Sequence, residues 1–291
     1  MIFMQQLING IALGSVYALI ALGYTMVYGI VQLINFAHGD IYMIGAFAAY
    51  YAANMFNLSF VPTLLAAMVV CALLGMTIER LAYRPIRKAP KITALITAIG
   101  ISLLLENLVR IIIGPNPKSF PGLLTSKMVT IGNLEIDSLK LVTLGVSIGL
   151  MILLTFIVHN TKVGKAMRAV SQDKDAARLM GIDIDRIISY TFGIGSALAA
   201  VGGVLVGVLY QRIDPLMGIM PGLKAFTAAV LGGIGVIPGA MAGGVLMGIA
   251  ESLTKGFIST KFSDAIAFSI LIIILLFRPS GLLGKKSSEK V

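Results

Sequence analysis

The chain has 291 residues, of which 57% are hydrophobic and only 12% are charged, and its mean hydropathy is +0.94. A soluble domain carries about 25% charged residues, so this composition excludes a water-soluble globular protein and indicates a surface in contact with membrane lipid. The formal net charge of +10 does not indicate nucleic-acid binding, because the basic residues gather beside hydrophobic segments, as the positive-inside rule expects.

Long runs without Asp, Glu, Lys or Arg predict membrane-spanning helices. These runs are residues 1–37, 41–78, 141–158, 187–211 and 225–250. A run of about 18 or more apolar residues is long enough to cross the bilayer core. The N-terminal run has no basic segment ahead of it and no convincing cleavage site, so we interpret it as a first spanning helix and not as a signal peptide.

A polar interruption follows the first helix at Asn35, His38, Gly39 and Asp40, before the apolar run 41–56. We predict that this segment separates two helices near a polar site. An ionisable group at membrane depth is costly and is often functional. Two interpretations of His38 and Asp40 stay open: a site that lines the pore, with a proton relay as one variant, or simple solvation at an interface. We expect no metal site, since His159 is the only other histidine.

Three basic clusters predict the topology. They are Arg80, Arg84, Arg87, Lys88 and Lys91; then Lys162, Lys165, Arg168, Lys174, Arg178 and Arg186; then Arg278, Lys285, Lys286 and Lys290. Because Lys and Arg accumulate in cytoplasmic loops, we place all three clusters in the cytoplasm. Two helices, roughly 92–113 and 141–158, lie between the first and second clusters. The proline-containing segment 114–140 that joins them is therefore predicted to be external.

Three apolar segments, 187–211, 225–250 and 263–277, lie between the second and third clusters, and three crossings would leave the tail on the wrong side. We predict that the middle segment turns back on itself as two short helices, because glycine favours turns and proline lacks the amide donor. The candidate pore or broken-helix residues of this turn are Gly232, Gly233, Gly235, Pro238 and Gly239. Glu251, at the end of the segment, faces either the pore or the external rim. A broken segment in each half also indicates an internal repeat.

The cytoplasmic stretch 164–182 predicts an amphipathic helix. It is rich in alanine, carries charges of both signs, and ends at Gly181, which suits a helix C-terminal cap. A short amphipathic helix of this kind lies either in the groove of a partner protein or on the lipid surface. The residues by themselves leave both interpretations open.

This stretch, with the run TFGIGSALAAVGGVLVGVLY after it, resembles the LivH-type permease subunits of branched-chain amino acid ABC importers. The similarity continues through DPLMG, GLKAFTAAVLGGIGVIPGAMAGGVLMGIAESL and RPSGLLG, and includes ALGYTMVYGIVQLINFAHGDIYMIGA, so it covers essentially the full chain. The resemblance implies that the cytoplasmic helix couples to an ATPase subunit. The matched coupling residues are Gly164, Arg168, Ala169, Asp173, Ala176, Ala177, Gly181 and Ile182.

The expected architecture is an all-α integral membrane protein with one transmembrane domain over residues 1–291. It is a polytopic bundle of about eight helices, or ten if short segments count separately, with broken or re-entrant helices and a cytoplasmic coupling region at about 159–186. The resemblance implies a multi-pass permease in the plasma membrane of a prokaryote, the inner membrane of the cell, that imports branched-chain or related amino acids.

The chain contains no G-x-x-x-x-G-K-[ST] loop, so we expect it not to be an enzyme and to bind no cofactor. ATP and Mg are expected on two partner ATP-binding subunits. The other expected partners are a second, paralogous permease subunit and an extracytoplasmic solute-binding protein. The competing hypothesis is a secondary transporter or channel for small polar solutes, which also uses broken helices but needs no cytoplasmic docking element.

Overall fold

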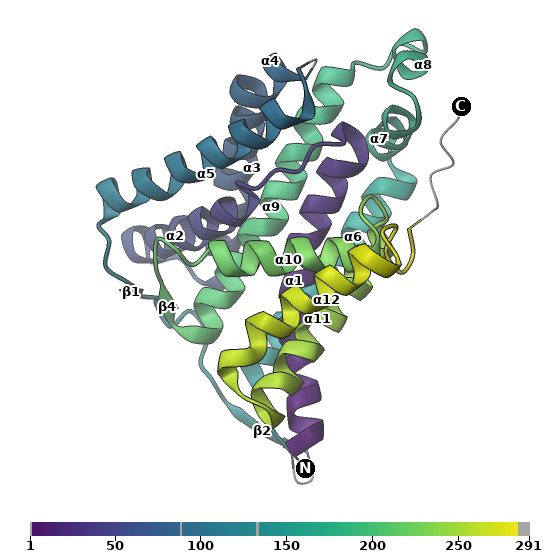
Figure 1. Ribbon diagram of the computed structural model, residues 1–291. Coiled ribbons are helices and arrows are strands. Elements are labelled where there is room, and N and C mark those ends of the chain that lie inside the picture. The colour runs from purple at the N-terminus through teal and green to yellow at the C-terminus, as the bar shows by residue number, and fades with distance from the viewer. Residues whose placement is uncertain (1, 88, 132–133, 285–291) are drawn as a thin grey trace.

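The computed structural model describes residues 2–284 apart from Lys88 and residues 132–133, and this part of the chain is largely helical (Figure 1). The helices of the first half are α1 (Ile2–Val31), α2 (His38–Phe56), α3 (Phe60–Ile78), α4 (Arg84–Ile86) and α5 (Lys91–Ile113), with a π-helical turn at Glu79–Tyr83. Those that follow are α6 (Ser138–Asn160), α7 (Lys162–Gln172), α8 (Lys174–Leu179), α9 (Ile184–Tyr210), α10 (Ile219–Gly232), α11 (Ile237–Phe257) and α12 (Ser263–Phe277), with a 3₁₀ turn at Thr260–Phe262. The short strands β1 (Lys118–Ser119) and β4 (Arg212–Ile213) pair antiparallel, as do β2 (Met128–Ile131) and β3 (Leu134–Asp137).

Seven helices of the described chain are long and apolar enough to cross a membrane. The first is α1, and the second is the continuous helix Phe60–Ile86, which contains α3 and α4. The others are α5, α6, α9, α11 and the helix Thr260–Phe277, which contains α12. The helix α10 is apolar but has only 14 residues. The prediction of a polytopic all-α membrane protein is confirmed, and the predicted helices 92–113, 141–158, 187–211 and 263–277 are found within two or three residues as α5, α6, α9 and α12.

The first half contains a re-entrant break. The helix α1 ends at Val31, and the non-helical segment 32–37 leads back into the bundle. The new helix α2 begins with the His38 ring directly against Gly23 of α1. Gly23 lies eight residues before the end of α1, about 12 Å along its axis, so α2 starts inside the bundle. The predicted break is therefore confirmed, with one correction: His38, Gly39 and Asp40 form the first turn of α2 and are not part of the break.

The second half contains the corresponding break at a different place from the one predicted. The segment between α9 and α10 leads back so that Gly218 and Gly222 lie against Gly39 in the first turn of α2. The predicted turn at 232–239 does separate two helices. However, α11 has 21 residues and is long enough to span, so the prediction of two short helices was wrong. Proline at the N-terminus of α11 costs no hydrogen bond, which explains why Pro238 begins a long helix there.

Helices α1 and α9 form the buried centre of the bundle. Glycines allow the helices around them to pack closely: a Cβ atom on Gly14 of α1 would lie 2.8 Å from the Val245 Cα of α11. A Cβ on Gly244 of α11 would lie 2.4 Å from the Ala18 Cα of α1. Small residues at such a spacing bring two helix backbones together, which is how helices associate in lipid.

The two halves of the bundle repeat the same contacts. Helix α1 packs on α11 as α9 packs on α3, and α2 packs on α9 as α10 packs on α1. Helix α2 contacts α3 and α5 as α10 contacts α11 and α12. Since α1 and α9 run in opposite directions in Figure 1, the α1–α2–α3–α5 and α9–α10–α11–α12 units form an inverted repeat. The predicted internal repeat is confirmed.

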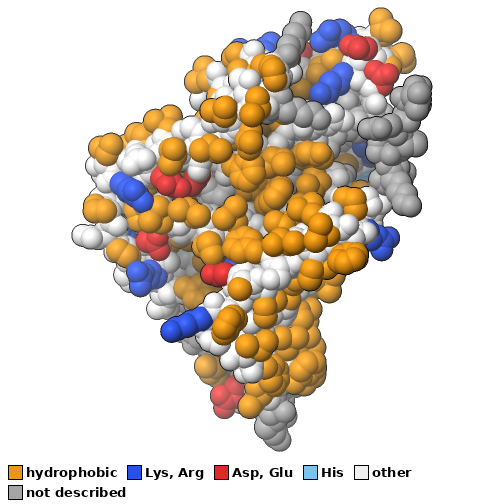
Figure 2. Space-filling model, in the orientation of Figure 1, with side chains coloured by type: hydrophobic (Ala, Val, Ile, Leu, Met, Phe, Trp, Pro, Cys, Tyr) orange, Lys and Arg blue, Asp and Glu red, His pale blue; other side chains and the backbone are white. Residues whose placement is uncertain are grey.

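The two ends of the bundle differ in what they carry. The N-terminus and β2 lie at the bottom of Figure 1 and the β1–β4 pair lies at its left edge, while α4, α7 and α8 lie at the top. The second basic cluster and Arg80, Arg84 and Arg87 of the first are at that top end; Lys88, Lys285, Lys286 and Lys290 lie outside the described residues. Figure 2 shows that the face formed by α5, α10 and α12 between these ends is mainly hydrophobic.

The arrangement predicts a topology that labelling can test. In a Cys71→Ala background, a cysteine at Lys174 of α8 should react only with a reagent that enters the cytoplasm. A cysteine at Lys127, which is exposed beside β2, should react with an impermeant reagent added outside. Labelling of the Lys174 position from outside would contradict the topology.

Candidate functional site

The predicted coupling helix is two helices. Helix α7 ends at Gln172, and Asp173 adopts an extended conformation before α8 begins. The Asp173 carboxylate accepts hydrogen bonds from the amides of Asp175 and Ala176, at 2.9 Å and 3.0 Å. A side chain that caps a new helix in this way competes with continuation of the old one, so the prediction of one unbroken helix over this stretch was wrong.

Helix α7 is fixed tightly to the end of α6. A Cβ on Gly164 would lie 2.2 Å from the Ile157 carbonyl oxygen, so only glycine fits there. The Arg168 guanidinium donates to the Val158 carbonyl oxygen at the C-terminal end of α6, where a cation also complements the helix dipole. These contacts fix α7 against the C-terminal end of α6.

Helix α8 presents an apolar tip. Leu179 and Met180 are 88% and 82% exposed, although Ala177 in the same helix is buried. Gly181 has a φ of +78°, which confirms the predicted helix cap, and the Ile182 amide donates to the Ala177 carbonyl at 3.1 Å. Of the remaining predicted coupling residues, Ala169 is half-buried and Ala176 is exposed.

A charged network joins α4 and the adjoining π turn to the start of α9. Arg87 pairs with Glu79, which is fully buried, and also with Asp185 of α9. Arg84 pairs with Asp185, and the Ser189 hydroxyl donates to Glu79. Burial lowers the pKa of Lys174 at the start of α8, and the Arg87 charge lowers it further. The network joins α4 to α9, and the Arg87 charge also acts on the start of α8.

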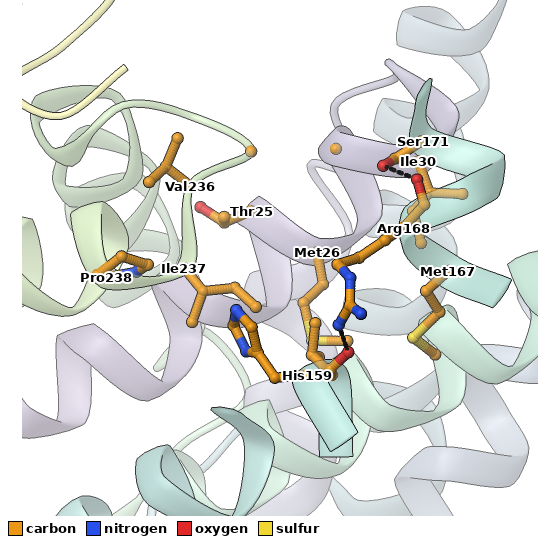
Figure 3. A pocket seen from close by; sticks show the side chains of 13 residues that line it. Thr25, Met26, Ile30, His159, Met167, Arg168, Ser171, Val236, Ile237 and Pro238 are labelled. Atoms are coloured by element: carbon orange, nitrogen blue, oxygen red, sulfur yellow. Dashed lines mark hydrogen bonds between the residues drawn. The ribbon is translucent and has the colours of Figure 1, made fainter. Parts of the chain in front are cut away.

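A cavity of about 270 Å³ lies where α7 meets the core (Figure 3). Its walls come from α1, the end of α6, α7 and the 235–238 turn. The labelled lining residues are Thr25, Met26, Ile30, His159, Met167, Arg168, Ser171, Val236, Ile237 and Pro238. The Thr25 hydroxyl is buried and has no hydrogen-bond partner among the described residues. Of the predicted turn residues, Gly235 and Pro238 line this cavity.

The turn between α10 and α11 packs against the C-terminal segment. Gly233 and Gly235 have φ of +105° and +92°, which only glycine adopts readily. A Cβ on Gly233 would lie 2.6 Å from the Gly284 amide nitrogen, and the Leu282 amide donates to the Leu231 carbonyl at 2.8 Å. Gly232 and Gly239 are also in backbone contact across the turn.

The first turn of α2 places its polar residues on different sides. The His38 ring packs edge-on against Tyr24, with ring centroids 4.7 Å apart. Asp40 instead lines a second cavity, of about 390 Å³, with Ser102 and Glu106 of α5. The structure thus does not bring His38 and Asp40 together. In the break before α2, the Asn35 side-chain oxygen accepts a hydrogen bond from the Tyr83 hydroxyl at 2.9 Å.

Glu251 lies in a buried ionic cluster within the bundle. Its carboxylate is 2.8 Å from Lys224 of α10 and 2.6 Å from Lys255, and the Tyr17 hydroxyl of α1 donates to it at 2.8 Å. Lys224 also pairs with Asp264 of α12 at 2.6 Å. The cluster joins four helices, so Glu251 occupies neither an exposed rim nor an open wall. Sequence reasoning missed Lys224, although a lone lysine at the edge of a long apolar run is itself a signal.

Comparisons with known proteins identify a family, relatives in sequence and a similar fold. Residues 6–275 match the family described as "Branched-chain amino acid transport system / permease component". The chain is 44% identical to the high-affinity branched-chain amino acid transport system permease protein LivH of Escherichia coli (strain K12), over 99% of this chain and 98% of that protein. It is 26% identical to the permease protein LivM of the same strain, over 93% of this chain and 68% of LivM. A chain of PsaBC from Streptococcus pneumoniae in complex with Fab has a similar fold, with a TM-score of 0.52 at 14% identity over 95% of this chain and 92% of that one.

The Gly233 turn should tolerate no side chain. In Gly233→Leu, the positive φ costs about 1–3 kcal/mol, and the Cβ meets the backbone of the C-terminal segment. We expect a lower melting temperature in detergent. Gly145→Leu is the matched control, since a Cβ there meets no atom within 4 Å. Equal melting temperatures of the two variants would show that the turn is not tightly packed.

The ionic cluster should depend on Glu251. Glu251→Gln keeps the shape of the side chain but leaves Lys224 with Asp264 alone and removes the acidic partner of Lys255. Removing one partner from a buried ion pair costs about 3–5 kcal/mol, and we expect a loss of unfolding free energy up to this size. Thermal melting in detergent measures the loss, with Glu135→Gln in the exposed hairpin as the control. A melting temperature equal to that of the control would contradict the structural role of the cluster.

Proposed function

Because the chain belongs to the family of permease components of branched-chain amino acid transport systems, we propose that it imports branched-chain amino acids as one permease of an ATP-driven complex. The proposal rests on one observation. The same chain contains two helices that begin inside the bundle, α2 and α10, and an exposed helix pair, α7–α8, at one end. Transporters bind solute where broken helices meet. A subunit without its own nucleotide loop needs a contact through which a motor acts.

The α7–α8 pair is the proposed contact with an ATPase subunit. Leu179 and Met180 form an apolar tip surrounded by Lys174, Asp175 and Arg178, which suits insertion into a groove of a soluble protein. ATP and Mg would then bind to two such partner subunits, and this chain would hold no cofactor. The alternative position of these helices, flat on lipid, is less favourable because the tip projects from the end of the bundle in Figure 1.

Motion of the docked pair has a direct mechanical route into the bundle. Arg168 and Gly164 fasten α7 to α6, and α7 also packs on α1 and α9. The cavity in Figure 3 separates α7 from the 235–238 turn, so α7 can move relative to the turn before the two surfaces meet. We infer that closing and opening of the ATPase pair tilts α6–α7 against the two central helices.

A second permease is proposed to cover the hydrophobic face in Figure 2. Exposed side chains of α5 and α12, including Leu103, Leu104, Ile272 and Ile273, would pack against it. The similarity to LivM supports a paralogous partner, and the pore would lie between the two permeases. A solute-binding protein would dock at the opposite end from α8, beside the β1–β4 strand pair and away from the β2–β3 hairpin. We place the complex in the plasma membrane of a prokaryote.

A substitution in the apolar tip of α8 tests the proposed contact and leaves the helix bundle unchanged. Met180→Asp introduces a charge at an 82% exposed position and should abolish ATPase co-purification and lower uptake of radiolabelled leucine at least tenfold. Met128→Asp, at a 67% exposed position of β2 on the other end, is the matched control and should keep both. Uptake that persists after deletion of every candidate ATPase would support the secondary-transporter hypothesis instead.

A further inference from the structure

The cavity between α2, α5 and α10 contains two buried carboxyl groups that no described residue neutralises. Asp40 is 3% exposed and Glu106 is 8% exposed, and both line this space of about 390 Å³. Neither forms an ion pair with any residue in the described ranges, whereas Glu251 in the same bundle has two lysines. A buried carboxylate without a cation is strongly unfavourable, so each group is either protonated or paired with a cation that a ligand brings.

The remaining walls suit an organic cation. Tyr24 and Phe36 line the same cavity, and both rings pack on Phe226, with centroid distances of 5.9 Å and 5.7 Å that hold them in place. Aromatic faces attract ammonium groups through their quadrupole. Leu95, Ile99 and Leu103 of α5 provide an apolar wall, and all three are also exposed on the surface of α5, so the cavity opens toward that face.

The helix starts that meet at the cavity suit an anion. Gly39 is in the first turn of α2, and Gly218 caps α10; a Cβ on Gly39 would lie 2.5 Å from the Gly218 carbonyl oxygen. Gly218 and Ile219, at the N-terminus of α10, line the space as well. The N-terminus of a helix carries partial positive charge, which favours a carboxylate. At α10 the attraction comes from the helix dipole, because the Ile219 amide already donates to the Leu216 carbonyl and Pro221 has no amide hydrogen. The cavity therefore offers negative charge, an aromatic surface and a positive helix end within one space.

We propose that this cavity is an amino acid site on the translocation route, in which Asp40 and Glu106 receive the α-ammonium group and the start of α10 receives the α-carboxylate. The apolar wall of α5 then faces the aliphatic side chain. The site rests on the proposed import function and assigns it a place in this chain. It also explains why the chain has two re-entrant breaks, because the helices that follow them, α2 and α10, both begin at this cavity.

Protection from a carboxyl reagent tests the site directly. The purified full-length chain in detergent is treated with dicyclohexylcarbodiimide, and modification of Asp40 and Glu106 is followed by peptide mass spectrometry. We expect leucine to slow the modification at least threefold. Leucinamide, which keeps the ammonium group, should also protect, and 4-methylpentanoate, which lacks it, should not. Equal modification with and without leucine, or equal protection by 4-methylpentanoate, overturns the proposal.

Uptake by the assembled transporter provides the second arm. The double variant Asp40→Asn with Glu106→Gln should lower leucine uptake at least tenfold, while Glu106→Asp should restore more uptake than Glu106→Gln when each is tested alone. Glu135→Gln, the same chemical change outside the cavity, should stay within twofold of the unmodified chain. Uptake by the double variant within twofold of the unmodified chain overturns the site. Absence of branched-chain amino acid uptake by the unmodified transporter instead contradicts the proposed function, so the two failures are distinguishable.

Discussion

The close contact of helix backbones through small residues is the constraint on which the rest of this structure depends. In lipid, no hydrophobic effect drives helices together, so association relies on packing and on polar contacts between helices. Glycines on α1 and α11 let these helices approach so closely that no side chain would fit between them. Gly75 of α3 lies equally close to Ser196 of α9. These two pairs hold the inverted halves against each other, and the shorter helices α2 and α10 pack in the remaining space.

This tightly packed frame allows the chain to contain broken helices. Irregular backbone at membrane depth is tolerated only where it is buried in protein or lines a cavity. The segments 32–37 and 211–218 meet this condition where they approach the centre of the bundle, since Asn35, Ala37 and Gly218 are buried and Gly218 lies against Gly39. The buried ionic groups follow the same logic: Lys224 and Glu251 satisfy each other across α10 and α11.

Polar clusters at the two ends of the bundle suggest how motion would be transmitted. At the end that carries α7 and α8, Arg87 joins the π turn to α9, and Arg168 joins α7 to α6. Nearer the opposite end, Lys224 joins α10 to α11 and α12. A displacement of α7–α8 would therefore act on whole helices and not on single side chains, and α10, which borders the cavity of Asp40 and Glu106, is attached to both halves of the frame.

The sequence by itself determined the membrane-embedded class, the main spanning helices, the break in the first half and the glycine cap at Gly181, whereas the corresponding break of the second half lies between α9 and α10 and not at the predicted turn. These features follow from local properties: charge-free length, the missing amide of proline and the backbone freedom of glycine. Only the tertiary structure decided the partners of the polar residues. The division of the coupling helix at Asp173 depended on a capping bond that competes with helix propensity, and the extent of α11 depended on where the chain turns. The pairing of Lys224 with Glu251, the separation of His38 from Asp40, and the meeting of Asp40 with Glu106 join residues far apart in the chain. No local pattern encodes such meetings, because they arise from how an inverted pair of helical units packs.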